Sequence, residues 1–411
     1  MSIKFRRLLF YSLVLAFLIA SGILVFYSSG WVLNFKTLAF EKTGGLLLKT
    51  SPQGVIIKIN DKVFEDKSGF LNNGTIVKDL SPGFYNIEVQ KEGYQTWKKE
   101  LEILPGLVTA AKTILLPPAT SESAKNLIAT SVQNFYIDRE GAIIVEKSAG
   151  KIELLDKSAS ATIPSQYQIQ EILSDSVLTI NQKESYILTY FQSPASSTNI
   201  SELFWKLKEK TLNLPGQVKI LKAAYRPSAK NEFIIITGGG IYSLATKGSP
   251  TLKLLKRAAI NKPIIYENRM LWLDEDQGLV IFNPENGVTN FISLESEVGE
   301  FVLSPDFKKI ALLEKDGNII IIALEEFEFD FLWPKLSSIK ISDEKADKSA
   351  LIWAAGSNHL LFKSGNNLIL SEIDNRSNLN QHIIAENVKK FLTDKKGNIY
   401  ILTTTRELLK I

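Results

Sequence analysis

The stretch Phe301–Ile322 reads FVLSPDFKKIALLEKDGNIIII, and it contains the unit from which most of this 411-residue chain is built. Its first apolar segment ends at the turn Ser304-Pro305-Asp306. A second apolar segment, Ile310–Leu313, is separated from Ile319–Ile322 by Asp316-Gly317-Asn318. Asp-Gly suits tight hairpin turns, whose two central residues need positive φ. Short apolar segments between such turns predict consecutive antiparallel strands of one sheet.

The same hairpin unit recurs along the C-terminal part of the chain. Its first strands begin 37 to 50 residues apart, about 43 on average, and a propeller blade takes roughly 40–45 residues. The repeat therefore predicts a β-propeller of seven blades over residues 126–411, with an open solenoid or two stacked sandwiches as alternatives. The recurring strands are Ala142–Glu146, Tyr186–Tyr190, Phe233–Ile236, Met270–Leu273, Ile310–Leu313, Leu360–Phe362 and Ile399–Leu402.

The last repeat is incomplete, because only three strands precede the C-terminus. A propeller closes its ring or leaves an open sheet edge at each end. The apolar stretch Asn126–Val132 precedes the first complete repeat. We therefore expect it to supply the missing outer strand, beside Leu408–Ile411.

The N-terminal stretch predicts membrane attachment. Leu8–Tyr27 is an uncharged run that would span ~30 Å as a helix, the thickness of the bilayer hydrocarbon. Lys4, Arg6 and Arg7 precede it, so the positive-inside rule makes residues 1–7 cytoplasmic and residues 31–411 extracytoplasmic. A cleaved signal peptide is the alternative, but its hydrophobic region is normally shorter. The sequence predicts a single-pass cell-membrane protein.

A juxtamembrane segment, 28–43, leads to a first folded module at 44–117. Tyr85, Ile87 and Val89 alternate with polar residues, which predicts a sheet with one buried face. Two prolines and small polar residues mark a linker at 118–125. The strands expected in the module are Leu46–Thr50, Val55–Ile59, Phe84–Gln90, Tyr94–Ile103 and Leu107–Leu116.

The turns of this module follow a recognisable order. They are Ser51-Pro52-Gln53-Gly54-Val55, Asn60-Asp61-Lys62, Leu80-Ser81-Pro82-Gly83-Phe84-Tyr85 and Gly93-Tyr94. In this order they resemble a PEGA domain, a small exported β-sandwich. Gln53 stands where that family has Glu, the hairpin at Asn60 lacks the usual Gly, and Gly69–Gly74 replaces a Gly-x-Thr-Pro segment. The resemblance implies envelope location and a role in adhesion or spacing, and it brings no catalytic residues.

Phe301–Ala311 resembles the Ser-Pro-Asp-Gly-Lys-x-Ile-Ala blade motif of TolB-like propellers, with Phe307 in place of the glycine. This resemblance implies the same fold class that the repeat predicts. The expected architecture is all-β after one N-terminal transmembrane helix, with a small PEGA-like β-sandwich followed by the propeller.

Composition excludes several kinds of chemistry. The chain has no Cys, so disulfides, thiolate metal sites and cysteine nucleophiles are excluded. The net charge is +4, and the three basic residues before the apolar run account for most of it, so no nucleic-acid partner is predicted. His359 and His382 fit no zinc motif, and Ser357 near His359 is better interpreted as part of a turn. We expect no catalytic, cofactor-binding or metal-binding residues, and no cofactor.

Two clusters nevertheless stand out. Asp274-Glu275-Asp276 is interpreted as a solvated hairpin turn, with a Ca²⁺ site as the alternative, because Ca²⁺ needs six to eight oxygens. In Glu325–Pro334, aromatic residues alternate with acids, which predicts a strand with one packed and one hydrated face, including a hydrated Asp330. The alternative is a partner-binding edge made by Phe327, Phe329, Phe331 and Trp333. This longest repeat is also expected to contain an insertion.

Three functions fit these expectations. The first is a non-catalytic membrane-anchored surface or envelope protein whose propeller is a binding or scaffold platform, held off the membrane by the PEGA-like module. Its partners would be the bilayer, through residues 8–27, and an envelope polymer or protein. The second is an exported propeller hydrolase acting on glycan or peptide, which would need two carboxylates ~5–9 Å apart. The third is a purely structural envelope component. Acids and aromatics clustered at the propeller channel would favour the hydrolase.

Overall fold

The computed structural model describes residues 3–28, 30–34, 39–66, 74–119, 126–137, 141–148, 151–155, 159–162, 167–173, 176–181, 187–192, 208–213, 219–226, 232–245, 251–266, 269–276, 278–328, 330–341, 347–354 and 356–411. The chain divides into two compact units. Unit 1 comprises Met1–Thr120, Ala323–Ile341 and Leu370–Ile384, and unit 2 comprises Ser121–Ile322, Ser342–Ile369 and Ala385–Ile411. Most of the expected linker at 118–125 lies outside the described residues.

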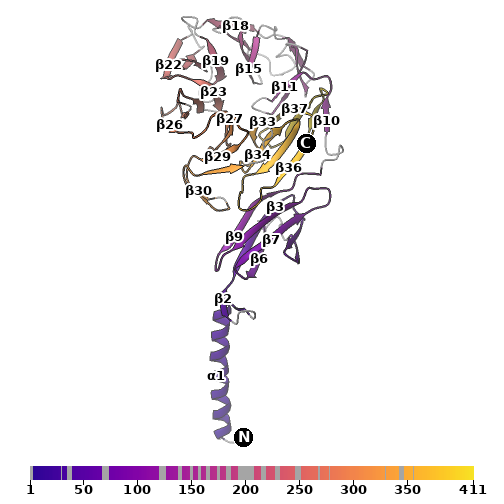
Figure 1. Cartoon of the computed structure of the whole chain (residues 1–411), viewed down its shortest axis with the longest axis vertical. Coiled ribbons are helices and arrows are strands. Elements are labelled where there is room, and N and C mark those ends of the chain that lie inside the picture. Colours follow the sequence, from indigo (N-terminus) through magenta and orange to yellow (C-terminus); the bar gives the residue numbers. More distant parts are fainter. Residues whose placement is uncertain are drawn as a thin grey trace. The chain divides into compact units, whose positions relative to one another are not determined.

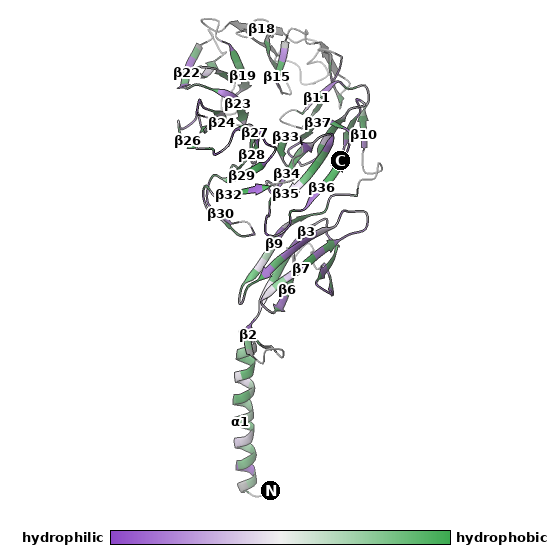
Figure 2. Cartoon of the chain, in the orientation of Figure 1, coloured by the Kyte–Doolittle hydropathy of each residue, from purple (hydrophilic) through white to green (hydrophobic). Residues whose placement is uncertain are grey.

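Unit 1 begins with one long helix, α1 (Ile3–Ser28) (Figure 1). Leucine, phenylalanine and alanine dominate it, and Figure 2 shows it as mainly hydrophobic over its length. α1 starts before the apolar run, because Arg6 and Arg7 are good helix formers and extend it. It ends just before Gly30, whose positive φ of 81° suits the turn that terminates a helix. None of the apolar window Phe5–Phe26 is buried.

A two-stranded ribbon follows α1 and leads into the module. β1 (Trp31–Asn34) pairs with β2 (Ala39–Lys42). The Phe26 ring stacks on Trp31 at a centroid distance of 5.5 Å and meets Phe40 edge-on at 4.9 Å. The end of the helix is therefore an aromatic cluster.

The rest of residues 44–117 forms two facing sheets. One has the order β6-β3-β9 and the other the order β5-β4-β7-β8. In β8 the inward side chains alternate strictly with exposed ones, as in a half-buried strand. Residues such as Leu46, Ile57 and Trp97 fill the core between the sheets. The strands are β3 (Gly44–Ser51), β4 (Ile56–Ile59), β5 (Lys62–Glu65), β6 (Thr75–Leu80), β7 (Gly83–Gln90), β8 (Trp97–Ile103) and β9 (Val108–Leu115).

Two strands of this sandwich, β5 and β6, were not predicted. The β4–β5 hairpin closes without glycine because Asn60 adopts a φ of 51°, a conformation that asparagine tolerates. Tyr94 lies outside β8, in the turn before it. Most of the Gly69–Gly74 segment lies outside the described residues.

The remaining strands form a series of antiparallel sheets. Within the described residues, seven sheets have four strands and belong to this series. First strands of consecutive sheets contact one another, as β15 and β19 do, and so do β11 and β37 from the two ends of the series. The first strands are therefore innermost in a ring, and Figure 1 shows the sheets following one another around it. Their strands are β11 (Asn134–Ile137), β12 (Ile143–Ser148), β13 (Lys151–Leu154), β14 (Ala159–Thr162); β15 (Tyr167–Leu173), β16 (Ser176–Asn181), β17 (Ile187–Gln192), β18 (Lys208–Asn213); β19 (Ile220–Tyr225), β20 (Glu232–Thr237), β21 (Gly240–Ala245), β22 (Thr251–Arg257); β23 (Asn261–Tyr266), β24 (Arg269–Leu273), β25 (Leu279–Phe282), β26 (Thr289–Ile292); β27 (Val298–Leu303), β28 (Lys309–Glu314), β29 (Ile319–Ala323), β32 (Ser338–Ile341); β33 (Lys348–Trp353), β34 (His359–Ser364), β35 (Asn367–Glu372), β36 (Gln381–Ala385); β37 (Val388–Thr393), β38 (Ile399–Thr403), β39 (Leu408–Lys410) and β10 (Asn126–Ala129).

The ring closes by pairing strands from its two sequence ends. β10 runs antiparallel to β39, with Asn126 opposite Lys410. This pairing confirms the expected closure, in which three C-terminal strands and one strand from the start of the propeller form a single sheet. The fold is therefore a mostly β chain with one N-terminal apolar helix and a β-propeller, as the sequence predicted.

Two details differ from the repeat expected in the sequence or add to it. Tyr186–Tyr190, taken as equivalent to the second strands of the other sheets, overlaps the third strand, β17. The second strand is β16, whose apolar residues alternate with polar ones and so give a weaker signal. The expected insertion is present, since the two-stranded ribbon β30 (Phe327–Glu328) and β31 (Leu332–Trp333) lies in sequence between β29 and β32.

Candidate functional site

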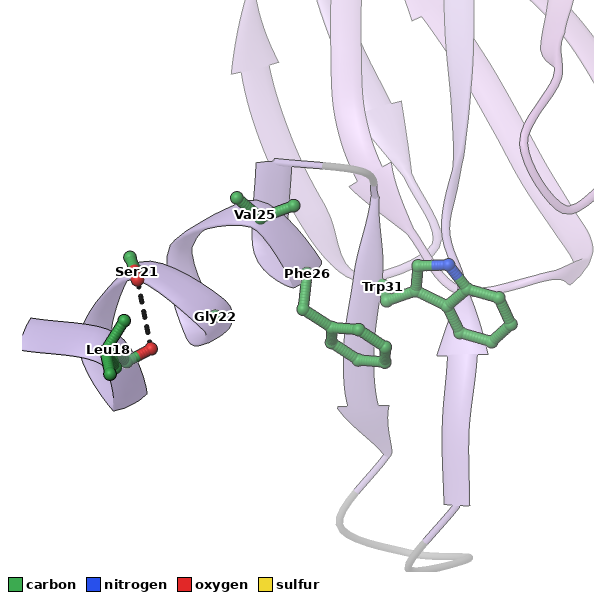
Figure 3. A pocket seen from close by; sticks show the side chains of 6 residues that line it. All are labelled: Leu18, Ser21, Gly22, Val25, Phe26 and Trp31. Atoms are coloured by element: carbon green, nitrogen blue, oxygen red, sulfur yellow. Dashed lines mark hydrogen bonds between the residues drawn. The ribbon is translucent and has the colours of Figure 1, made fainter. Parts of the chain in front are cut away.

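The α1 helix has the surface expected of a helix in contact with lipid. Its described serines Ser12, Ser21 and Ser28 each donate the hydroxyl hydrogen to the carbonyl oxygen three residues earlier, at 2.8–3.0 Å. Each of these hydroxyls thus has a partner within the helix, as a hydroxyl facing hydrocarbon would need. Figure 3 shows the Ser21 bond to Leu18 beside a shallow hollow at Gly22, closed on one side by Phe26 and Trp31. The window Phe5–Phe26 has 22 residues, which span ~33 Å as a helix.

Lys4, Arg6 and Arg7 lie in the first turns of α1, as the orientation hypothesis requires. A helix of this length and composition near the N-terminus also fits a signal sequence. Membrane insertion and its direction therefore stay predictions.

The innermost strands of unit 2 carry charged side chains that contact neighbouring sheets. Their carboxylates bind backbone amides of the next sheet. Glu171 Oε2 on β15 accepts from the Tyr225 amide on β19 at 2.7 Å. Glu300 Oε2 on β27 accepts from the Leu351 amide on β33 at 3.2 Å.

Lysines on the innermost strands bind carbonyl oxygens of the next sheet in the same way. Lys262 Nζ on β23 donates to the Val298 and Gly299 oxygens, both at 3.1 Å. Lys390 Nζ on β37 donates to the Phe135 oxygen on β11 at 2.7 Å. Burial lowers the pKa of Lys390 to about 8, with a neighbouring lysine adding to the shift. The sign of each charge thus matches the backbone group that it meets: carboxylates meet N–H groups and ammonium groups meet C=O groups.

Carboxylates are few on these strands. Across the described innermost strands, the carboxylates are Glu171 and Glu300. Two sheets lie between the sheet of Glu171 and the sheet of Glu300 in the order of the ring. The lysines there outnumber them. The charges on these strands stabilise the contacts between neighbouring sheets.

In unit 1, one edge of each sandwich sheet is covered by side chains from residues 323–341 and 370–384. β8 is the edge strand of one sheet. The Lys98 amide donates to Asn380 Oδ1 at 2.9 Å, Asn380 Nδ2 donates to the Lys98 oxygen at 3.0 Å, and the Glu100 amide donates to Ser377 Oγ at 3.2 Å. Unpaired strand edges promote aggregation, so these side chains protect the edge.

The edge of the other sheet, β9, is covered in the same manner. The Lys112 amide donates to Asp330 Oδ1 at 2.8 Å, and Arg376 Nη2 donates to the Ala110 oxygen at 2.8 Å. Both sheets of the sandwich are therefore joined by hydrogen bonds to segments more than 200 residues away in sequence.

A buried charge cluster lies beside these edges. Lys99 is fully buried, and its Nζ lies 2.6 Å from Glu372 Oε1 and 3.7 Å from Asp374 Oδ2. Trp97 Nε1 donates to the other Glu372 oxygen at 2.8 Å, and the Asn380 amide donates to Glu372 Oε1 at 2.9 Å. Removing one member would leave an uncompensated buried charge, which costs several kcal/mol.

Arg376 extends this cluster on the side of Asp374. Its Nε and Nη2 donate to the two carboxylate oxygens of Asp374 in a bidentate arrangement, and the shorter of these two bonds is 2.7 Å. The bonds from Arg376 and the charge of Lys99 outweigh burial and lower the pKa of Asp374. Asp374 is therefore held in its charged form.

Asp330 corrects the prediction that the acids of Glu325–Pro334 face water. Glu326 and Glu328 are exposed, but the Asp330 side chain is only 1% exposed, because it turns inward to the β9 edge. Burial raises the pKa of Asp330 to about 6, and the charge of Asp374 adds to this shift. The Lys112 amide and the charge of Arg376, whose Nη2 lies 3.8 Å away, oppose it.

The aromatic residues of the same segment pack on one another. Trp333 stacks on Phe327 at 5.4 Å and on Phe331 at 5.5 Å, and Arg376 lies over the Phe331 ring at 5.3 Å. Phe327 and Trp333 are buried. Phe329 lies outside the described residues. A partner-binding edge at this segment stays a prediction.

The structure does not bring the histidines together into a catalytic group. His359 lies on β34 and His382 on β36, and β35 lies between these strands, which we had expected to be neighbours. His382 Nδ1 lies 2.9 Å from Gln95 Oε1, and burial lowers the His382 pKa. Ser357 is buried in a turn, and its Oγ accepts from the Asp306 amide at 3.2 Å.

The acidic triplet lies in the β24–β25 hairpin, as predicted. Asp274 Oδ1 accepts from the Gly278 amide at 2.6 Å, which is a turn-closing bond. In the part of the chain that the structure describes, no group of three or more His, Asp or Glu side chains is placed to hold a metal ion.

The charge cluster and the edge contacts were missed in the sequence. Their partners are up to 288 residues apart, and no motif links them. One signal was present: Lys99 occupies an inward position of the β8 alternation, between Trp97 and Leu101. A lysine at a core position requires a buried acid, although the sequence does not say which one.

Comparisons with known proteins give no family. No protein-family model matches the chain, and no curated protein matches it. Solved β-propellers are similar to it at low identity. The β-propeller domain of Cps50 (Swd1) from Myceliophteria thermophila has 10% identity and a TM-score of 0.48, over 70% of this chain and 98% of that one.

Two further structures give similar values. Hsv2 from Kluyvelomyces marxianus has 11% identity and a TM-score of 0.46, over 67% of this chain and 90% of that one. YCF48 bound to D1 peptide has 12% identity and a TM-score of 0.49, over 70% of this chain and 94% of that one. The propeller assignment rests on the strand pairing of this chain and not on these likenesses.

Proposed function

We propose that this protein is a non-catalytic, membrane-anchored protein of the cell surface or envelope. α1 spans the membrane with residues 1–7 in the cytoplasm. The PEGA-like sandwich follows outside, and the propeller acts as a binding or scaffold platform for an envelope polymer or a protein.

The observation that carries the proposal is α1. A 22-residue apolar window without buried side chains is unstable in water, because an exposed apolar surface of that size is costly. Its serine hydroxyls already have acceptors within the helix. A bilayer satisfies this surface, and the basic residues at its start favour a cytoplasmic N-terminus.

The innermost strands bear on the hydrolase alternative. Glu171 and Glu300 each bind a backbone amide of the neighbouring sheet. A hydrolase acting at these strands would need two carboxylates ~5–9 Å apart, and Glu171 and Glu300 lie on sheets that are not neighbours. The exported hydrolase is therefore the less favoured alternative, and a purely structural envelope component is the other.

Membrane retention of the full chain tests the proposal. After alkaline carbonate treatment of membranes, the wild-type chain should stay in the pellet, because an integral helix is not released by loss of surface charge. A variant with Leu15→Arg and Leu18→Arg places two charges at the middle of the window, each costing ~3 kcal/mol at the bilayer centre. It should be released, whereas the control Leu15→Ile with Leu18→Val should be retained. Release of the wild-type chain would refute the anchor.

A further inference from the structure

The end of the sandwich next to α1 has an unusual surface. The β8–β9 turn there, Leu104-Pro105-Gly106-Leu107, carries two exposed leucines, whereas tight turns usually carry polar residues. At the opposite end, the β7–β8 turn carries Lys91 and Glu92. The two ends of one module therefore differ in polarity.

Hydrogen bonds place this turn beside the end of α1. The Gly106 amide donates to the Thr43 oxygen at 2.9 Å, and the Thr43 amide donates to the Gly30 oxygen at 2.7 Å. Gly30 lies two residues after Ser28, the last residue of α1. The Gly45 amide donates to the Leu107 oxygen at 2.9 Å, which fixes the turn to the first strand of the sandwich. Two backbone hydrogen bonds thus connect the turn, through Thr43, to Gly30 near the end of α1.

Close packing holds the turn in place. A Cβ added at Gly44 would lie 2.5 Å from the Leu104 oxygen, so only glycine fits there. The Lys42 side chain lies against Gly106, within 2.7–3.0 Å of where its Cβ would be. The backbone of the turn that carries the two leucines is therefore closely packed.

Four large apolar side chains are exposed at this end. Leu104, Leu107, Val108 and Phe84 have exposed fractions between 43% and 66%. Phe84 belongs here because Gly83, at the start of β7, pairs with Ile103 at the end of β8. Trp31 and Phe40, beside the helix end, are also exposed. We call these six residues the apolar end.

We propose that the apolar end rests in the lipid surface from which α1 emerges, so that the sandwich is a membrane-contacting module. This inference rests on the proposed function, since it needs α1 in the bilayer. Apolar side chains beside an aromatic cluster suit the boundary between headgroups and acyl chains, where tryptophan is also enriched. A lysine such as Lys42 suits the same depth, since its ammonium group can reach lipid phosphates.

The membrane is favoured as occupant by continuity along the chain. The hydrogen bonds through Thr43 hold the turn near the point where α1 must leave the hydrocarbon. A partner protein or a second copy would have to displace lipid from the same place. Both are treated as outcomes of the test below.

The absence of cysteine from the chain allows a direct test with single-cysteine variants of the full protein. Leu107→Cys carries an environment-sensitive fluorophore at the apolar end. Ile56→Cys is the matched control, because Ile56 is also an exposed apolar residue of the sandwich but pairs with Gln90, far from the apolar end. Leu15→Cys, at the middle of α1, reports the anchor itself. The proteins are reconstituted in phosphatidylcholine–phosphatidylglycerol vesicles whose acyl chains carry a nitroxide quencher near the headgroup.

We expect the Leu107→Cys label to be quenched at least ~3-fold more than the Ile56→Cys label, because groups at the headgroup boundary reach 5–10 Å into the lipid. The Leu15→Cys label should also be quenched. Leu104→Cys repeats the test at a second site of the turn, and unchanged melting temperatures show that the labelled proteins are folded.

The outcomes separate this inference from the anchor. Quenching at Leu15→Cys without quenching at Leu107→Cys and Leu104→Cys would overturn the membrane contact and leave the anchor in place. Loss of quenching at all positions would overturn both. Efficient disulfide-linked dimers of unlabelled Leu107→Cys, with no quenching of the labelled form, would overturn the lipid contact in favour of a second copy.

Discussion

The buried lysine of the sandwich gives the sharpest prediction for stability. Lys99→Met keeps the length of the side chain but removes the ammonium group that lies 2.6 Å from Glu372. Breaking a buried pair by removing one partner costs about 3–5 kcal/mol, since the remaining charge stays buried. Glu372 keeps bonds from Trp97 and Asn380, so we expect the lower limit, ~3 kcal/mol.

Hydrogen exchange measures this effect where it occurs. The amides of Lys98 and Glu100 bond to Asn380 and Ser377, so their protection depends on the edge contact that the cluster stabilises. A loss of ~3 kcal/mol corresponds to exchange roughly 100-fold faster in a peptide covering β8, because 1.4 kcal/mol is a factor of ten. The measurement is made on the full chain in vesicles.

The adjacent lysine supplies a matched control. Lys98 pairs with Glu88 at 2.7 Å, but its side chain is 69% exposed. Exposed pairs contribute about 0–1 kcal/mol, so Lys98→Met should change exchange less than ~5-fold. Equal effects of the two substitutions would refute the reasoning. The double variant Lys99→Met with Glu372→Gln should be less destabilised than the sum of the single variants, because it leaves no buried charge at position 372.

Three further predictions follow from charge and strand pairing. The raised pKa of Asp330, about 6, means that its contribution to stability is fully present below about pH 4 and is lost as pH rises through 6. Asp330→Asn should therefore gain stability relative to wild type between pH 4 and 7 in a denaturation series, and a flat difference between the two proteins would contradict the burial. Deleting residues 126–129 leaves one edge of β39 open, so the protein should melt at lower temperature and associate in light scattering. A deletion variant without association and with unchanged melting would disprove the closure. The lowered pKa of Lys390, about 8, means that the unfolded chain binds more protons than the folded chain between about pH 8 and 10.5. The stability of the wild-type protein should therefore rise over that range relative to Lys390→Met, and parallel pH profiles of the two proteins would argue against the burial of Lys390.

The class of the fold and its closure were predictable because they depend on local patterns. Apolar segments between Gly, Asn and Asp turns indicate hairpins, and the repeat length indicates a propeller. The pairing of β10 with β39 followed from counting strands against what a closed ring requires. Sheet β15–β18 was the exception, since its second strand is less apolar than its third and the repeat was placed one strand late.

The charge cluster could not be predicted, because it depends on tertiary contacts. Glu372, Asp374 and Arg376 carry no local signal of burial, and their partner Lys99 is about 275 residues away. Asp330 was expected to face water from strict alternation, but the β30–β31 ribbon is only two residues long on each side. Asp330 lies between the two strands and turns to the β9 edge. Alternation holds within a strand and not in the turn that ends it.

The direction of the chain across the membrane is the central claim, and labelling with a membrane-impermeant maleimide tests it most directly. Single cysteines are placed at exposed positions: Ile3→Cys at the first residue of α1, Glu92→Cys in the sandwich and Lys396→Cys in the propeller. In intact cells whose outer layers admit the reagent, the account predicts that Glu92→Cys and Lys396→Cys are labelled, whereas Ile3→Cys is labelled only after lysis. Labelling of Ile3→Cys in intact cells with protection of the other two would contradict it.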